Sequence, residues 1–137
     1  MEPIVVTTLV HAPVERVWSD YTSPEAITVW NTASPDWHTP YAENDLREGG
    51  RFLSRMEAKD GSFGFDFAGN YNAVVEHERI AYTMDDGRSV EVLFRSEGEN
   101  THMTVSFAPE SENPVELQRE GWQAILDSFT RYAEAAA

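Results

Sequence analysis

The clearest candidate for chemistry in this sequence is a histidine that stands close to a carboxylate. Asp36, Trp37 and His38 follow one another in a segment bounded by Pro35 and Pro40. A histidine beside a carboxylate can act as a general base near neutral pH. Neighbouring residues in a loop need not face the same way, however, and catalysis needs a second positioned group that this sequence does not supply. His38 is therefore the one candidate for a catalytic residue, and the alternative is that Trp37 caps the core edge while His38 is solvated.

The sequence contains no motif for a metal site or for a catalytic nucleophile. The four histidines are scattered, no pair has the spacing of one helical face, and neither an HExxH nor a DxDxDG motif occurs. There is no cysteine, no GxSxG elbow and no glycine-rich phosphate loop. We expect no metal and no cofactor.

Aromatic side chains are the more informative set. The pattern directs them toward one interior, where large flat rings form a core but also leave gaps that a flat apolar ligand can fill. A few polar groups among them would orient such a ligand, and His38, Tyr82 and the indole of Trp122 are our candidates. The candidate ligand-binding residues are Trp30, Trp37, His38, Phe52, Phe65, Phe67, Tyr82, Phe94, Trp122 and Phe129.

The elements that must position these residues begin with one strand and two short helices. Residues 4–10 are β-branched and mostly apolar, which predicts a strand. Apolar residues then recur at helical spacing after Pro13, and Ser23 precedes a second short helix that ends near Trp30. Between residues 31 and 41 the two prolines break any regular pattern, so we expect a loop there.

The middle of the chain has the pattern of an antiparallel meander. Asp60-Gly61 and Asp86-Gly87 are dipeptides that tolerate the positive φ angles of tight hairpins. Alternation places Phe63, Phe65 and Phe67 on one face and Asp66 on the other, and Gly69 has the position of a bulge that lets the sheet curl. The predicted strands are residues 51–58, 63–75, 80–84, 89–96 and 102–107.

The last segment predicts a long amphipathic helix over residues 113–136. Asn113, Pro114 and Glu116 have the order of a capping box, and an apolar stripe runs from Leu117 to Tyr132, with Gln118 on the wetter side. Such a helix must cover the concave face of the sheet, and we expect Gly121 to permit close backbone approach there. The predicted fold class is α+β, with a curved antiparallel sheet wrapped around this helix in a single domain over residues 1–137.

Composition narrows the classes of partner. The sequence contains ten Lys and Arg residues and 24 Asp and Glu residues, so its formal charge is −14. This charge repels nucleic acid and anionic lipid. The first residues lack the basic and apolar runs of a signal peptide, and no apolar stretch approaches membrane-spanning length. We expect a cytoplasmic protein that binds no nucleic acid and inserts into no membrane.

Five short motifs in order carry a resemblance to a known family. They are residues 45–52 (DLREGGRF), Asp60-Gly61, residues 67–71 (FAGNY), residues 78–83 (ERIAYT) and Glu120-Gly121-Trp122. In this order, and over nearly the whole chain, they resemble the START-like (SRPBCC) superfamily, and within it the bacterial group similar to the Aha-type activator of a heat-shock-protein ATPase. The resemblance implies a helix-grip fold with a cavity for an apolar or aromatic small molecule between sheet and helix.

Three functions stay open on this evidence, because one fold serves many activities. The leading hypothesis is a protein that binds a lipid-like, aromatic or polyketide-like molecule. The second is an enzyme of the polyketide cyclase or hydrolase type that uses His38, or a carboxylate that points inward, as acid or base. The third is a co-chaperone-like module that contacts another protein through its acidic surface. We favour binding over catalysis.

Overall fold

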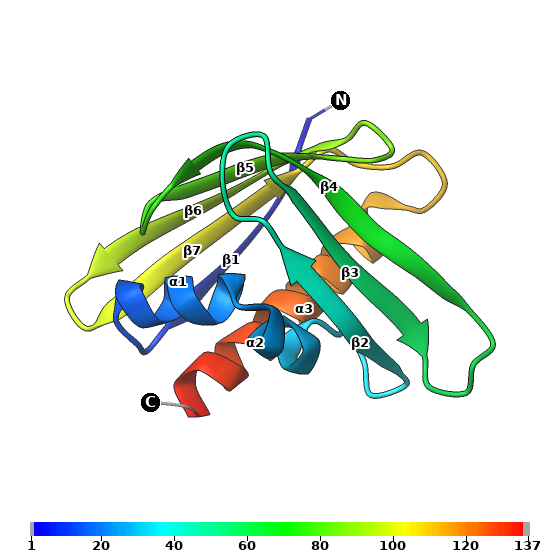
Figure 1. Cartoon of the computed structure of the whole chain (residues 1–137), viewed down its shortest axis with the longest axis horizontal. Coiled ribbons are helices and arrows are strands. Elements are labelled where there is room, and N and C mark those ends of the chain that lie inside the picture. The colour runs from blue at the N-terminus through cyan, green and yellow to red at the C-terminus, as the bar shows by residue number, and fades with distance from the viewer. Residues whose placement is uncertain (1, 136–137) are drawn as a thin grey trace.

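The computed structural model describes residues 2–135 and contains seven strands and three helices (Figure 1). The N-terminal strand, the two short helices and the long C-terminal helix are β1 (Ile4–Val10), α1 (Val14–Thr22), α2 (Pro24–Trp30) and α3 (Val115–Ala135). The remaining strands are β2 (Trp37–Asn44), β3 (Arg51–Ala58), β4 (Gly64–Val75), β5 (Arg79–Met84), β6 (Ser89–Glu97) and β7 (Asn100–Phe107). Ala136, the predicted last residue of the long helix, lies outside the described residues.

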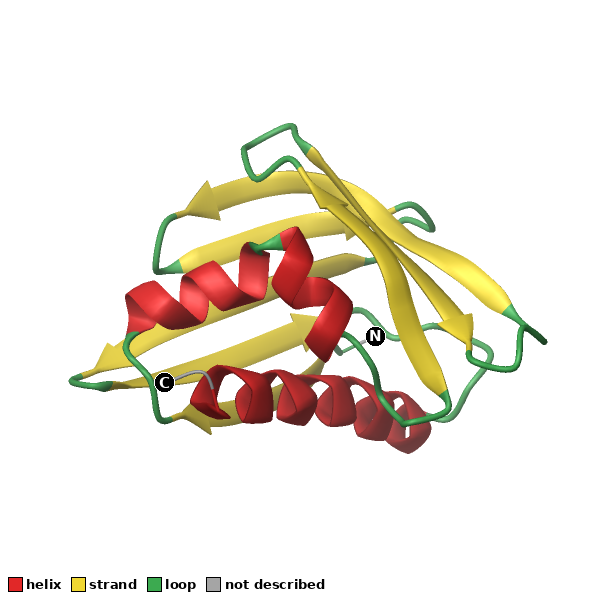
Figure 2. Cartoon of the chain, turned by 60° about the horizontal axis from the view of Figure 1, so that its bottom comes forward, coloured by secondary structure: helices red, strands yellow, loops and turns green. Residues whose placement is uncertain are grey.

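The strands form one antiparallel sheet in the order β1-β7-β6-β5-β4-β3-β2. Consecutive strands from β2 to β7 are neighbours, so this part is the meander that the sequence predicts, and β1 pairs with β7. The sheet curls strongly, and the three helices lie on its concave side (Figures 1 and 2). This is the predicted helix-grip architecture.

One strand was not predicted. The segment that the prolines were expected to keep irregular contains β2, which pairs with β3 at the edge of the sheet. The register of this pair shifts between His38 and Tyr41, on either side of Pro40. A proline is tolerated at an edge strand or a bulge because its missing N–H breaks no ladder there. The prediction of a loop up to residue 41 was therefore wrong.

Gly69 allows two strands to approach closely, and it is not the position of the β-bulge that was predicted there. The register of β4 against β5 shifts between Tyr71 and Ala73, two residues later than expected. A Cβ atom on Gly69 would lie 2.4 Å from the carbonyl oxygen of Thr83 and 3.1 Å from the ring of Phe52, its cross-strand neighbour. The glycine thus lets the Phe52 ring pack directly on the backbone of β4.

Helix α3 is attached to the β1 edge of the sheet and to α2. The Oγ1 atoms of Thr8 and Thr130 are 2.8 Å apart, and Gln123 Nε2 donates to the carbonyl oxygen of Thr7 at 3.0 Å. Ser128 Oγ donates to the carbonyl oxygen of Trp30 at 2.8 Å. These contacts hold the helix beside β1, while the sheet curves away from it toward β3 and β4 (Figure 2). Within residues 2–135, no helix is long and apolar enough to cross a membrane.

Candidate ligand-binding site

A cavity of about 570 Å³ lies between the concave face of the sheet and helix α3. Small-molecule sites in proteins typically enclose roughly 300–1,000 Å³. Residues from α1, α2 and α3 and from the strands β2, β3, β4, β5 and β7 line it. The cavity exists because α3 packs on one edge of the sheet while the opposite edge is closed by α2 and β2, so the middle of the curve is left unfilled.

The wall of the cavity on the sheet side is aromatic. Phe52 packs against Tyr82 with ring centroids 4.7 Å apart and against Phe67 at 5.5 Å. Trp122 of α3 stacks on Phe107 at 4.0 Å and contacts Phe67 edge-on at 6.2 Å. Aliphatic side chains complete the apolar lining, namely Ile27, Met56, Ile80, Val105, Ile125 and Leu126. Such a surface favours an apolar ligand because its burial removes apolar area from water.

Gly121 opens the cavity on the helix side. A Cβ atom at this position would meet no atom within 4 Å, and Gly121 lines the cavity. The expected close approach between this glycine and the sheet is therefore wrong. The missing side chain widens the space in front of the helix and does not tighten its packing.

Two apolar side chains of the cavity lining are also exposed to solvent. Phe65 is 42% exposed and Leu117 is 54% exposed, and both also line the interior. Trp37 contacts Phe63 and Phe65 with centroid distances of 6.0 Å in both pairs. An apolar ligand entering here would meet apolar surface before it reaches the interior.

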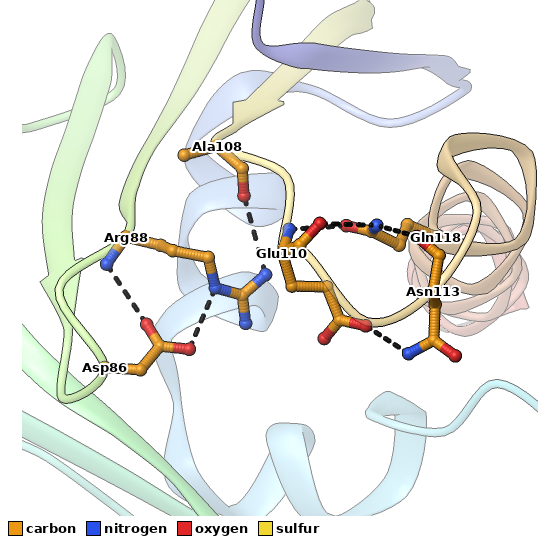
Figure 3. Close-up of polar contacts among 6 residues, drawn as sticks. All are labelled: Asp86, Arg88, Ala108, Glu110, Asn113 and Gln118. Carbon is orange, nitrogen blue, oxygen red and sulfur yellow. Dashed lines mark hydrogen bonds and ion pairs between the residues drawn. The ribbon is translucent and has the colours of Figure 1, made fainter. Parts of the chain in front are cut away.

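Two groups of polar contacts include residues of the cavity lining near the start of α3 (Figure 3). Arg88 Nε donates to Asp86 Oδ2 at 2.8 Å, and its Nη1 lies 3.5 Å from the carbonyl oxygen of Ala108. Gln118 Oε1 accepts from the backbone N–H of Glu110 at 2.9 Å, and Asn113 donates to the Glu110 carboxylate. Gln118 is buried by these contacts, which corrects its prediction on the wetter side of the helix.

Three tyrosines, Tyr21, Tyr71 and Tyr82, line the cavity. Tyr71 Oη donates to Asn44 Oδ1 at 2.5 Å, and Asn44 Nδ2 donates in turn to the carbonyl oxygen of Thr22 at 2.8 Å. Burial raises the pKa of Tyr21, Tyr71 and Tyr82, and for Tyr82 the neighbouring phenols of Tyr21 and Tyr71 add to the effect. All three phenols are therefore neutral hydrogen-bond donors near neutral pH.

Seven of the ten candidate ligand-binding residues line the cavity. They are Trp30, Trp37, Phe52, Phe65, Phe67, Tyr82 and Trp122. Phe94 and Phe129 are not on its surface, because they form the core beneath α1 and contact Tyr21 with centroid distances of 5.7 Å and 5.1 Å. Their aromatic patterning is the same as that of the lining residues, so the sequence could not separate the two groups.

His38 also lies away from the cavity. It is on β2 with Nε2 3.9 Å from Glu57 Oε1, and both side chains are more than a third exposed. Asp36 is exposed as well, while Trp37 is half-buried at the core edge. Asp66 points to the outer face as alternation predicts, since its carboxylate is 3.3 Å from Arg55 Nη1. Neither His38 nor Asp66 faces the cavity.

Several lining residues were not among the predicted set. Tyr21 and Tyr71 lie in elements that were predicted, and alternation along β4 would have directed Tyr71 inward with Phe67, whereas Arg88 lies in the turn between β5 and β6. Ser54 and Asn31 are buried polar residues on the cavity wall that no motif marks. Among residues 2–135, no three His, Asp or Glu side chains lie close enough together to hold a metal ion.

A curved antiparallel sheet that closes over a long C-terminal helix around an apolar cavity defines a protein of the START-like, helix-grip class. Residues 11–134 match the family model described as "Activator of Hsp90 ATPase homolog 1-like protein", and the chain belongs to this family. A search of curated proteins finds no match.

Solved structures agree with this assignment. The chain is similar to the AHSA1-like protein from Aeromonas hydrophila, with 43% identity, a TM-score of 0.88, and coverage of 97% of this chain and 94% of the other. It is also similar to protein Chr148 from Cytophaga hutchinsonii, with 48% identity, a TM-score of 0.85, and coverage of 98% and 93%. Protein CV1439 from Chromobacterium violaceum shares the fold at 23% identity and a TM-score of 0.86, with coverage of 98% and 99%.

Proposed function

We propose that this protein binds a hydrophobic small molecule, lipid-like or aromatic, in the cavity between the sheet and α3. The observation that carries the proposal is a hollow of about 570 Å³ lined mainly by aromatic and aliphatic side chains. A space of this size would otherwise weaken the fold, because an unfilled apolar cavity costs contact energy in proportion to its volume. Its retention beneath a helix that carries Gly121 at the cavity wall supports a role for the space itself.

The enzyme hypothesis has less support from the geometry. Its proposed acid or base, His38, is on β2 outside the cavity lining, and its Nε2 lies 3.9 Å from Glu57 Oε1. The interaction-module hypothesis would gain from a filled interior beside an apolar surface patch, whereas this interior is hollow and the exposed side chains of Phe65 and Leu117 continue into it. Both observations favour small-molecule binding.

The test is to fill the cavity from the helix side. In a Gly121→Trp variant the indole occupies the open space, and we expect the affinity for the neutral fluorophore phenylnaphthylamine to fall at least tenfold, or about 1.4 kcal/mol. The matched control is Glu120→Trp, which adds the same side chain at an exposed position of the same helix. This control should bind as the wild type does. Equal affinity in all three proteins, measured by fluorescence titration, would contradict the proposal.

A further inference from the structure

Not all polar groups on the cavity wall are used by the protein. Within residues 2–135, no hydrogen bond joins Tyr21 Oη or Tyr82 Oη to another group, whereas the Tyr71 hydroxyl is satisfied by Asn44. Tyr82 is only 8% exposed, so a hydroxyl without a partner there is costly unless something in the cavity accepts its hydrogen bond. Both unpartnered phenols line the cavity and are free to donate into it.

These two oxygens are not sealed inside the protein. In the described part of the chain, the enclosed side-chain polar atoms without a partner are Arg16 Nε and Asp20 Oδ2, which belong to α1. The hydroxyls of Tyr21 and Tyr82 are not in that group although they also lack partners, so each retains accessible surface. Because both residues line the cavity, a bound molecule can reach these oxygens.

The charges around the cavity disfavour an anionic ligand. Of the described lining residues, Arg88 is the only cation, and its Nε is already paired with Asp86 at 2.8 Å. Glu110 adds an acidic residue to the lining, with its carboxylate accepting from Asn113, and the whole chain has a formal charge of −14. A ligand carboxylate would be desolvated beside groups of its own sign, which costs free energy unless it is paired.

Resting on the proposed function, we infer that the ligand is a neutral ring compound carrying a carbonyl oxygen, which accepts a hydrogen bond from Tyr82 or Tyr21. The aromatic wall of Phe52, Phe67 and Trp122 then holds the ring system. The inferred ligand of the cavity is thus a ketone or a quinone. A fatty acid with an ionised carboxylate is excluded.

Three naphthalenes of nearly equal shape test this inference. Acetylnaphthalene offers the carbonyl oxygen, isopropenylnaphthalene replaces that oxygen by CH₂, and naphthoate replaces the acetyl group by a carboxylate at the same ring position. We expect the ketone to bind roughly three- to tenfold more tightly than the alkene, as one neutral hydrogen bond predicts. Naphthoate should bind most weakly. The carbonyl stretching frequency of the bound ketone should fall, as hydrogen bonding requires.

Tyrosine variants locate the donor. In the double variant Tyr82→Phe/Tyr21→Phe, the preference for ketone over alkene should disappear. The affinity for the alkene should be retained, and this shows that the cavity is intact. Tyr132→Phe is the matched control, because Tyr132 lies on α3 outside the residues that line the cavity. Three results would overturn this inference and leave the proposed function standing. The wild type binds ketone and alkene equally, the double variant keeps the preference for the ketone, or naphthoate binds most tightly. Failure of all three compounds to bind would overturn the proposed function as well.

Discussion

Gly69 and Gly121 are glycines for opposite physical reasons. At Gly69 a Cβ atom would lie 2.4 Å from the Thr83 carbonyl oxygen, so the backbone of β4 and β5 requires the missing side chain. At Gly121 a Cβ atom meets nothing within 4 Å, so the helix tolerates one sterically. The fold therefore requires glycine at position 69, whereas glycine at position 121 keeps the cavity open.

Two alanine substitutions measure this difference. Gly69→Ala should reduce the free energy of unfolding by about 1–3 kcal/mol through overpacking against backbone. Gly121→Ala should instead increase it by roughly 0.5–1 kcal/mol, because alanine is the better helix former and pays no steric cost here. Urea denaturation of both variants beside the wild type checks the signs. A destabilised Gly121→Ala protein would show that the space in front of α3 is not open.

At the scale of elements, an ion pair joins β3 to the end of β5 across β4. Arg51 Nη2 lies 2.6 Å from Asp85 Oδ2, and Nη1 also donates to Asn70 of β4 at 3.2 Å. The hydrogen bond from Arg51, assisted by its charge, holds the pKa of Asp85 below its ordinary value of 3.8. A lowered folded-state pKa means that the pair stabilises the fold above pH 3.8, and that this contribution is lost as pH falls through the folded-state pKa.

Asp85→Asn should therefore destabilise the protein near neutral pH, and the difference from the wild type should shrink once the pH is well below 3.8. Glu48→Gln, at an exposed position in the loop before β3, is the control and should show no such convergence. Denaturation midpoints at several pH values provide the measurement. A stability difference that stays constant down to the most acidic pH would contradict the assignment.

The elements were predictable where one periodicity dominates. Alternation gave the strands from β3 to β7 nearly to the residue, and helical spacing gave α1, α2 and α3. The strand β2 was missed because Pro35 and Pro40 are breakers in a central strand but not at an edge. Gln118 was placed on the wrong side because its burial depends on backbone groups of Glu110 and Asn113, which sequence spacing does not reveal.

At the scale of the whole molecule, the cavity depends on how the layers meet. The helix α3 is fixed to β1 by Thr130 and Gln123, and the opposite side is closed where Thr39 Oγ1 of β2 donates to the carbonyl oxygen of Asn31 at 2.6 Å. Hydrophobic patterning identifies the inward face but not the distance between the layers. It therefore could not distinguish Phe67, on the cavity wall, from Phe129, in the solid core.

The location of a bound ligand tests the account most directly. Intermolecular nuclear Overhauser effects should connect the protons of bound isopropenylnaphthalene with the side chains of Phe67 and Tyr82 on the sheet and of Ile125 on α3, all of which line the cavity. Contacts confined to exposed side chains outside the cavity lining, such as Phe63 and Val75, or no contacts at saturating probe, would contradict binding between the sheet and α3.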